Sequence, residues 1–228
     1  NNDGSIASQV RAQPSAGFSI CTYTGNGTGG ASIGHGLNAA VEFLIVKDRG
    51  AVASWHCQHS AIGNTSAIFL NSNSAAVSNG AYWNNTSPTD SVFTVGTADG
   101  MNGIDNTYVA YCFAPVANYS HMGSYQGNGS SDGPAVFTGF RPAFILIKAS
   151  SIAGEDWVIL DTSRAPNNVS NLLIKPNTAE QEFTNSAYNT DILSNGFKIR
   201  NSNPRFNQSG ATYIYYAVAE NPFQANGG

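Results

Sequence analysis

Charged residues are scarce in this chain. They make up 11% of its 228 positions, against about 25% in a typical soluble protein. Ten lysines and arginines face 14 aspartates and glutamates, so the formal net charge is −4. This balance excludes a protein that binds nucleic acid through a basic patch, because neutralising phosphates takes clustered cations. Long hydrophobic runs are also missing, since none approaches the roughly 18 residues of a membrane-spanning helix. We therefore expect no membrane insertion.

Cysteine is equally scarce. The three cysteines, Cys21, Cys57 and Cys112, are too few, and odd in number, for a disulfide scaffold. Cys21 and Cys112 fall in the first and last strands expected for the first half of the chain, so a disulfide between them stays open. We favour the other interpretation, in which buried thiols pack as small hydrophobic groups.

The sequence also lacks a strong catalytic motif. A Gly-x-Ser-x-Gly nucleophile elbow is absent. Glycoside hydrolysis needs two carboxylates that flank a cleft, and the close acidic pairs are Glu155-Asp156 and Glu180/Glu182. Both pairs lie among turn-forming residues and have no counterpart in the first half of the chain. We therefore expect a protein that is not an enzyme and that uses no cofactor.

Small polar residues take the place of the missing charges. The chain holds 24 glycines and 26 asparagines, and such an uncharged polar surface is more typical of an extracellular or virion protein than of a cytosolic one. Eight asparagines fit the Asn-x-Ser/Thr pattern that permits N-glycosylation: Asn26, Asn64, Asn84, Asn85, Asn118, Asn128, Asn168 and Asn207. A chain this rich in Asn, Ser and Thr also produces the pattern by chance.

An internal repeat runs through the chain with a period a little over 100 residues. Its landmarks recur in the same order at a nearly constant offset. They pair 23–27 with 125–129, 36–37 with 139–140, 43–47 with 144–148, Trp55 with Trp157, 92–95 with 196–199, and 107–114 with 212–219. The repeat predicts two copies of one module, at 17–115 and 116–223. Residues 1–16 then form an N-terminal arm, and residues 224–228 a tail or linker.

Each landmark is a short run of Val, Ile, Phe and Tyr between clusters of Gly, Asn, Ser and Asp. Such runs are typical of β-strands joined by turns. About 100 residues of short strands predict a β-sandwich. We therefore expect an all-β fold of two tandem, jelly-roll-like β-sandwich domains. The closing segments 108–113 and 213–218 are apolar on both faces, which indicates a central strand beside the opening strand of each module.

Several short motifs together resemble a known type of module. They are Gly-Phe-Ser-Ile at 17–20, Tyr-Thr-Gly-Asn-Gly at 23–27, Ile-Gly-His-Gly-Leu at 33–37, Phe-Leu-Ile-Val-Lys at 43–47, Gly-Phe-Arg-Pro-Ala-Phe at 139–144 and Ala-Glu-Asn-Pro-Phe at 219–223. The set resembles an uncharacterised module of predicted tail-fibre-like and other structural proteins of aquatic phages and environmental bacteria. The resemblance covers roughly 16–223. It implies display on a virion or an extracellular appendage, and it carries no catalytic residues.

The N-terminal arm is predicted to form a single strand. Ile6, Ser8, Val10 and Ala12 alternate with other residues and give it one modestly apolar face. The arm has no obvious place in a module that starts at residue 17. We therefore predict that it pairs with a sheet edge of a neighbouring subunit, as in strand addition. The alternative is a flexible or locally packed leader.

One loop is rich in hard oxygen ligands. Asp99, Asn102 and Asp105 are the residue types that calcium prefers. Their spacing does not match the twelve-residue calcium loop, and Asp, Asn and Gly are also the usual turn residues. We favour a turn here and predict no metal site, with calcium as the second interpretation.

Three aromatic residues lie in loop-like contexts: Tyr82, Trp83 and Tyr188. Flat rings beside Asn and Asp stack on sugars, although rings in loops also pack onto the sandwich itself.

The repeat, the low charge, the N-terminal arm and the resemblance together give the leading functional prediction. It is a structural protein that forms a homo-oligomer or filament, such as a tail fibre or surface appendage. The alternative is a carbohydrate-binding, lectin-like module for host attachment.

Overall fold

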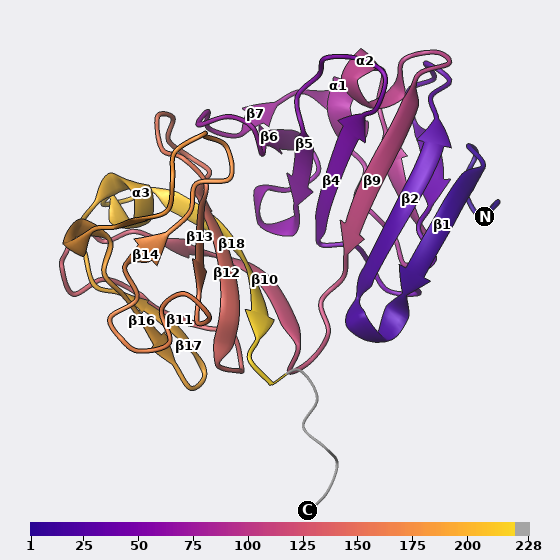
Figure 1. The fold of residues 1–228 in the computed structure, drawn as a ribbon. Helices are drawn as coiled ribbons and strands as arrows, with labels where there is room; N and C mark the ends of the chain where they lie inside the picture. The colour runs from indigo at the N-terminus through magenta and orange to yellow at the C-terminus, as the bar shows by residue number, and fades with distance from the viewer. Residues whose placement is uncertain (222–228) are drawn as a thin grey trace, which may run out of the picture. The chain divides into compact units, whose positions relative to one another are not determined.

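The structure is a computed structural model that describes residues 1–221. It is all-β, as predicted, with several sheets and three one-turn helices in the described chain (Figure 1). None of these helices is long or apolar enough to cross a membrane. The chain divides into two compact units. Unit 1 comprises Asn1–Leu70 and Ala76–Pro115, and unit 2 comprises Asn71–Ala75 and the chain from Val116 onward. The tail expected at 224–228 lies outside the described residues.

Unit 1 is built on a main sheet with the strand order β1-β2-β9-β4-β5-β6-β7. In chain order these strands are β1 (Ser8–Gln13), β2 (Phe18–Thr24), β4 (Phe43–Asp48), β5 (His56–His59), β6 (Ser66–Phe69), β7 (Val77–Ser78) and β9 (Thr107–Phe113). A second sheet pairs β3 (Ala31–Gly34) with β8 (Val92–Val95). Helices α1 (Gly80–Trp83) and α2 (Asp99–Asn102) are single turns. The core lies between the sheets, where Tyr23, Leu44 and Tyr108 of one sheet meet Ile33 and Phe93 of the other.

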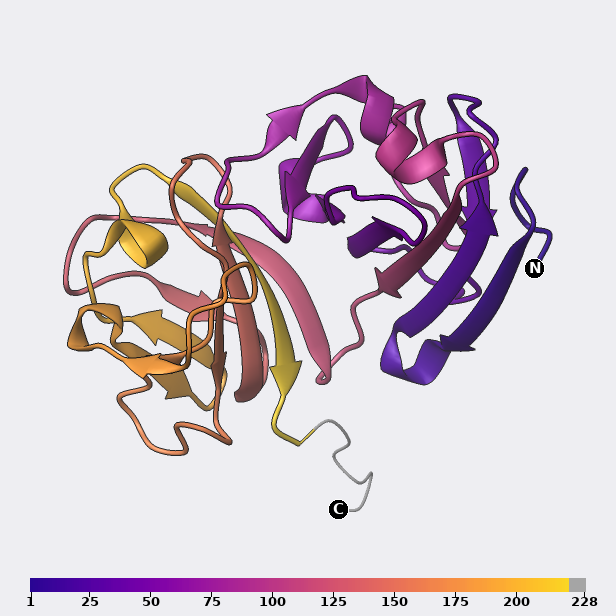
Figure 2. The ribbon, with the colours of Figure 1, turned by 45° about the horizontal axis from the view of Figure 1, so that its top comes forward.

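Unit 2 repeats this arrangement with fewer strands in its main sheet. That sheet has the order β10-β18-β12-β13, formed by β10 (Ser120–Gln126), β12 (Pro142–Ala149), β13 (Val158–Asp161) and β18 (Thr212–Ala219). The second sheet has the order β11-β17-β16, with β11 (Ala135–Phe137), β16 (Thr190–Leu193) and β17 (Gly196–Ile199). A hairpin of β14 (Leu172–Leu173) and β15 (Phe183–Thr184) and the single-turn helix α3 (Pro204–Asn207) complete the unit (Figure 2).

The closing strand of each unit is central in its main sheet. β9 lies between β2 and β4, and β18 lies between β10 and β12, which confirms the placement predicted from the sequence. Both strands direct alternate aromatic and small side chains into the core. Tyr23 of β2 stacks on Tyr108 of β9 with 5.1 Å between ring centroids. Tyr125 of β10 stacks on Tyr213 of β18 at 5.0 Å.

The N-terminal arm has a place in its own unit. β1 pairs antiparallel with β2 along its whole length, with Val10 opposite Cys21. Further toward the N-terminus, Ile6 forms a parallel bridge with Ile33 of β3. The expectation that this segment stands outside the module is wrong, because its small apolar side chains pack against the core of unit 1. Pairing of the arm with a neighbouring subunit stays a prediction.

Candidate functional site

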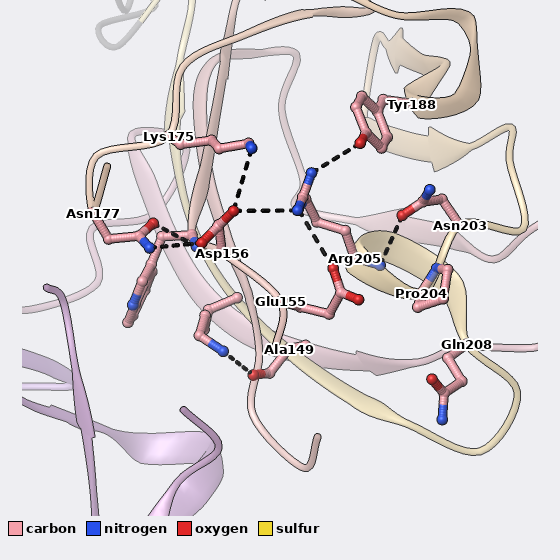
Figure 3. A network of polar contacts seen from close by, with 12 residues as sticks. Ala149, Glu155, Asp156, Lys175, Asn177, Tyr188, Asn203, Pro204, Arg205 and Gln208 are labelled. Atoms are coloured by element: carbon pink, nitrogen blue, oxygen red, sulfur yellow. Dashed lines mark hydrogen bonds and ion pairs between the residues drawn. The ribbon is translucent and has the colours of Figure 1, made fainter. Parts of the chain in front are cut away.

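Unit 2 holds a cluster of charged and polar side chains that are largely removed from solvent (Figure 3). Asp156 lies at its centre, with a side chain that is 13% exposed. Its Oδ2 is 3.2 Å from Arg205 Nη2 and 3.3 Å from Lys175 Nζ. Its Oδ1 accepts a hydrogen bond of 2.8 Å from Asn177 Nδ2. The Asp156 carboxylate is thus bound by three donors from three segments of the chain.

Arg205 links this carboxylate to its surroundings. The arginine belongs to α3, whose first turn is capped by Asn203 Oδ1 accepting from Arg205 N at 3.0 Å. Arg205 Nη1 donates to the Tyr188 hydroxyl at 2.9 Å. Its Nε lies 3.5 Å from Glu155 Oε2. Arg205 therefore binds both members of the acidic pair, Glu155 and Asp156.

Lys175 completes the cluster on the other side of Asp156. Its Nζ is 2.7 Å from Glu180 Oε2 and lies 5.2 Å from the centre of the Phe183 ring. With three acidic groups around two cations, the charges within the cluster nearly balance. Separating such partly buried pairs is costly, because a lone charge would remain in a poorly hydrated site. The cluster is thus suited to tie loops together.

The same contacts argue against acid–base catalysis at this cluster. A glycosidase needs one carboxyl group free to protonate the leaving group and a second one free to act as a base or nucleophile. Both oxygens of Asp156 are already engaged, and Glu155 is paired with Arg205. The arrangement fixes the positions of α3 and of the loop that carries Glu155 and Asp156.

Lys148 lies nearby and is fully buried. Its Nζ donates to the carbonyl oxygen of Ala149 at 2.6 Å. Burial lowers the pKa of this amine to about 8, and the charges of Glu155 and Asp156 partly oppose the shift. A lysine with a lowered pKa is a candidate nucleophile or base. Because the Lys148 amine is enclosed and bonded to the adjacent residue, we interpret its burial as structural.

A second polar site occurs in both units and is built around one buried asparagine. In unit 1, Asn102 is fully buried at the end of α2. Its Oδ1 accepts from Asn26 N at 3.0 Å. Its Nδ2 donates to the carbonyl oxygens of Thr28 and Gly96, both at 2.9 Å. One side chain thereby supplies partners for three backbone groups of two different loops.

Asn207 does the same in unit 2, at the end of α3. Its Oδ1 accepts from Asn128 N at 2.7 Å. Its Nδ2 lies 2.7 Å from Ser130 O and 2.8 Å from Asn201 O. We refer to Asn102 and Asn207 as the lock asparagines.

The stacked tyrosines fasten the same one-turn helices. Tyr23 donates to Met101 O at 2.8 Å, and the Tyr108 hydroxyl accepts from Gly103 N at 2.8 Å. In unit 2, Tyr125 donates to Phe206 O at 2.9 Å. The Tyr213 hydroxyl accepts from Gln208 N at 2.7 Å. Tyr108 and Tyr213 also each donate to a carbonyl at the start of the one-turn helix. The two units thus share one polar scaffold.

The calcium interpretation is wrong for Asn102, because its side-chain oxygen already binds a backbone N–H. Asp99 and Asp105 are exposed, and Asp105 has the positive φ of 62° found in tight turns. Among residues 1–221, no three His, Cys, Asp or Glu side chains come together in a way that could hold a metal ion. The loop is a turn that positions the lock asparagine Asn102.

The glycosylation pattern is wrong for Asn207, because this amide is fully buried. Asn168 is exposed, but its amide exchanges two hydrogen bonds with the backbone of Ile192. Asn64 is half-buried and donates to Ser87. The other five acceptor asparagines are exposed: Asn26, Asn84, Asn85, Asn118 and Asn128.

The predicted surface aromatics are not brought together. Trp83 is fully buried in the core of unit 1, so the expectation that it is exposed is wrong. The physical reason is α1, a single helical turn that directs the ring inward. Tyr82, also in unit 1, is half-buried and meets Phe69 edge-on at 5.8 Å. Tyr188 of unit 2 is engaged by the guanidinium of Arg205, 5.3 Å from its ring centre.

All three cysteines are buried free thiols. The Sγ atoms of Cys21 and Cys112 lie 4.0 Å apart on the neighbouring strands β2 and β9. Burial raises the pKa of the Cys57 thiol well above its usual value, which suits a side chain that packs as a small hydrophobic group.

The lock asparagines are the functional positions that sequence reasoning missed. In the sequence, Asn102 lies in a predicted turn with calcium as the second interpretation, and Asn207 fits the Asn-x-Ser/Thr pattern. A signal for their equivalence is present in the sequence. Each lies six residues before the first tyrosine of a closing strand, Tyr108 or Tyr213. This shared spacing makes Asn102 and Asn207 equivalent positions of the repeat.

Comparison with known proteins assigns the whole described chain to one family. The chain belongs to the family described as a domain of unknown function, DUF7483, whose model matches residues 1–222. No curated protein and no solved structure matches it. The family match includes both lock asparagines and the charged cluster of unit 2.

Proposed function

We propose that the protein is a non-enzymatic structural protein, a repeating subunit of an extracellular filament such as a phage tail fibre or surface appendage. The observation that carries the proposal is the shared scaffold of the two units. Their prominent buried polar side chains, Asn102 and Asn207 with the stacked tyrosines, all bind the backbone of their own unit. Such positions hold a fold together. On this proposal the chain consists of two tandem, jelly-roll-like β-sandwiches.

The charged cluster of unit 2 supports the same proposal. Arg205 and Lys175 hold its acidic side chains, and the cluster joins α3 to two loops. A rigid β-sandwich with paired internal charges and few surface charges is well suited to repeated contact with copies of itself. Association between such surfaces involves little electrostatic repulsion.

The N-terminal strand gives the proposal a second element. β1 is an edge strand of the main sheet of unit 1. Val10 and Ala12 direct their backbone groups away from β2, whereas those of Ser8 bind Asn1. Edge strands present rows of backbone donors and acceptors to other chains. Heterologous contacts that do not close into a ring generate filaments. We propose that this edge takes part in subunit contacts.

The test is electron microscopy of the native material purified from its source. We expect regular filaments or fibres whose axial repeat is sized for two β-sandwiches. Recombinant chain at matched concentration serves as the comparison, because it separates self-assembly from assembly that needs other components. Dispersed particles in both samples would count against the structural role.

A carbohydrate-binding role is the second proposal, and one hollow of unit 2 favours it. A pocket of about 300 Å³ is lined by Ser131, Ser186, Ala187, Arg200, Asn201, Ser202 and Asn203. Hydroxyl, amide and guanidinium groups of this kind bind sugar hydroxyls. Screening on a glycan array tests it, with Arg200→Ala expected to abolish binding and Arg49→Ala of unit 1 as the matched control. Equal binding by both variants would exclude this pocket.

A further inference from the structure

The main sheet of unit 2 ends in a regular strand, β10, whose outer edge from Met122 to Gln126 has no strand partner in the described part of the chain. Immediately after β10, Gly127 N donates to Ala211 O, and immediately before it, Tyr119 O accepts from Ala219 N. Because backbone groups alternate in direction along an antiparallel strand, residues 121, 123 and 125 face β18. Met122, Ser124 and Gln126 therefore direct their N–H and C=O groups outward. No backbone partner for these outward groups exists among residues 1–221.

The equivalent edge in unit 1 is covered. By the repeat, Ile20, Thr22 and Thr24 of β2 correspond to these three outward-facing residues of β10. Ile20 pairs with Arg11 of β1, and Thr22 pairs with Gln9. The short connection that leads into β10 supplies only Val116, which bridges Ser120 at the start of the strand. Unit 2 therefore has a strand position next to β10 that residues 1–221 leave without a strand.

The space beside that position is open as well. A Cβ added to Gly36 of unit 1 would lie 3.2 Å from Val10 and 3.4 Å from Ala12 of β1. Around its counterpart, Gly139, such an atom would meet nothing within 4 Å. The neighbouring Phe137 of β11 is 67% exposed. These residues line the place that an added strand would occupy.

The N-terminal segment of a second copy does not fit this place. In unit 1, a Cβ on Gly34 would lie 2.1 Å from the Asn1 side-chain oxygen. Phe137 stands at the position equivalent to Gly34, so a segment that begins with Asn1 would collide with its ring. The intact β1 edge of a second copy is also a poor match. Asn1 already takes both backbone groups of Ser8, and Arg11 adds a charge.

β10 itself is the strand that fits. Its sequence, Ser-His-Met-Gly-Ser-Tyr-Gln, holds no Asp, Glu, Lys, Arg or Pro, and its pairing with β18 is free of bulges. Charged side chains, proline and bulges usually protect an exposed strand edge from pairing, and β10 has none of them. Two copies placed antiparallel about Ser124 would pair Ser124 with Ser124 and Met122 with Gln126. Each of these pairs would exchange two backbone hydrogen bonds.

We infer that the β10 edge is an interface between two copies of this chain, which joins the main sheets of two second units across a two-fold axis. The exposed Phe137 rings cover the paired strands, as the residues around Gly34 cover β1 in unit 1. The contact is isologous, so it closes on itself and produces a dimer. It goes beyond the proposed structural function, because a dimer of this kind serves filament and soluble forms alike.

The first test is sedimentation velocity on the full chain over a concentration series. We expect a monomer–dimer equilibrium for the natural chain. Ser124→Pro removes the N–H at the centre of the pair but no bond to β18, and proline is tolerated at strand edges. We expect the dissociation constant to rise at least about tenfold, because two central hydrogen bonds are lost. Ser124→Ala keeps the N–H and is the matched control, with dimerisation unchanged.

Crosslinking keeps the inference testable if the proline variant misfolds. Residues that form a hydrogen-bonded antiparallel pair have Cα atoms about 5.5 Å apart, within reach of a disulfide. Ser124→Cys should therefore give a covalent dimer on mild oxidation. Gln126→Cys should not, because its own copy lies four residues further along, about 13 Å away. A monomer at all concentrations, or equal crosslinking by both variants, would overturn the inference. Failure of filament formation alone would not.

Discussion

Asn102 and Asn207 show how one residue type can suggest three different roles. Asparagine is common in cation loops, glycan acceptor patterns and turns, and the local sequence does not separate these uses. In this fold both lock asparagines are fully buried and bind three backbone groups each. A buried amide with its partners in place stabilises, whereas the same groups left unpaired are costly. The position in the fold decides the role.

Asn207→Ala should therefore destabilise unit 2. Removing the amide leaves the N–H of Asn128 and two carbonyl oxygens without partners in a buried site. We expect a loss of about 3 kcal/mol in the free energy of unfolding, measured by urea denaturation. Asn167→Ala, at an exposed asparagine of unit 2, is the control and should change stability by less than about 0.5 kcal/mol. A loss as small as the control's would refute the structural role of the lock.

Lys148 provides a prediction about pH. Its pKa is lowered to about 8, mainly by burial, from an unfolded value near 10.4. A lowered lysine pKa means that the folded state binds the proton less well than the unfolded state. The full stability is therefore present above about pH 10 and falls as the pH drops to 8. At pH 7 the buried charge costs up to about 3 kcal/mol.

Lys148→Met removes this cost, so we expect a more stable protein at pH 7 and a flatter stability profile between pH 8 and 10. Chemical denaturation at a series of pH values measures both quantities. Lys47→Met is the matched control, because Lys47 holds the equivalent position in unit 1 but is only half-buried. A destabilised Lys148→Met variant at pH 7 would show that the lysine's hydrogen bond to Ala149 outweighs its burial.

At the scale of elements, the strands that the repeat marks were predictable. β4 and β12 are continuous apolar runs, and β9 and β18 match closely, so their type and central placement follow from the pattern. The place of β1 did not follow. Its alternation indicates a strand, but its partner β2 is chosen by packing on a core that the local sequence does not display.

The candidate site was less predictable than the fold. The helices α1, α2 and α3 have four residues each, which is too short for a helical period to be recognised. These turns direct Trp83 into the core and Arg205 toward Asp156. The loop acids were recognised as a pair, but their cation lies about 50 residues away in the sequence. Such long-range pairing leaves no local signal.

The direction of backbone groups along β1 allows a paired experiment. Arg11 directs its N–H toward β2, opposite Ile20, whereas Ala12 directs its N–H away from the sheet. Arg11→Pro should therefore lower the stability of unit 1 by about 1–3 kcal/mol through the lost ladder hydrogen bond, and Ala12→Pro should cost clearly less. Thermal unfolding followed by circular dichroism compares the two. Equal losses would mean that the backbone hydrogen bonds between β1 and β2 contribute little to the stability of unit 1.

At the scale of the whole molecule, the division into two units with separate cores predicts two unfolding transitions in calorimetry. Asn102→Ala should shift one transition to lower temperature, and Asn207→Ala should shift the other. The double variant should show both shifts, since distant sites act additively. A single transition that moves as one in every variant would show that the two cores unfold as one cooperative structure.

The central placement of the closing strands also governs when each unit can fold during synthesis. β9 separates β2 from β4, and β18 separates β10 from β12, so neither main sheet can assemble until its last strand has left the ribosome. Roughly the first hundred residues therefore emerge without a completed sheet, and unit 1 then folds while unit 2 is still being translated. A nascent chain that stops before Thr212 lacks the strand that joins the two halves of the sheet of unit 2. Unit 2 can therefore complete its main sheet only after β18 has been translated.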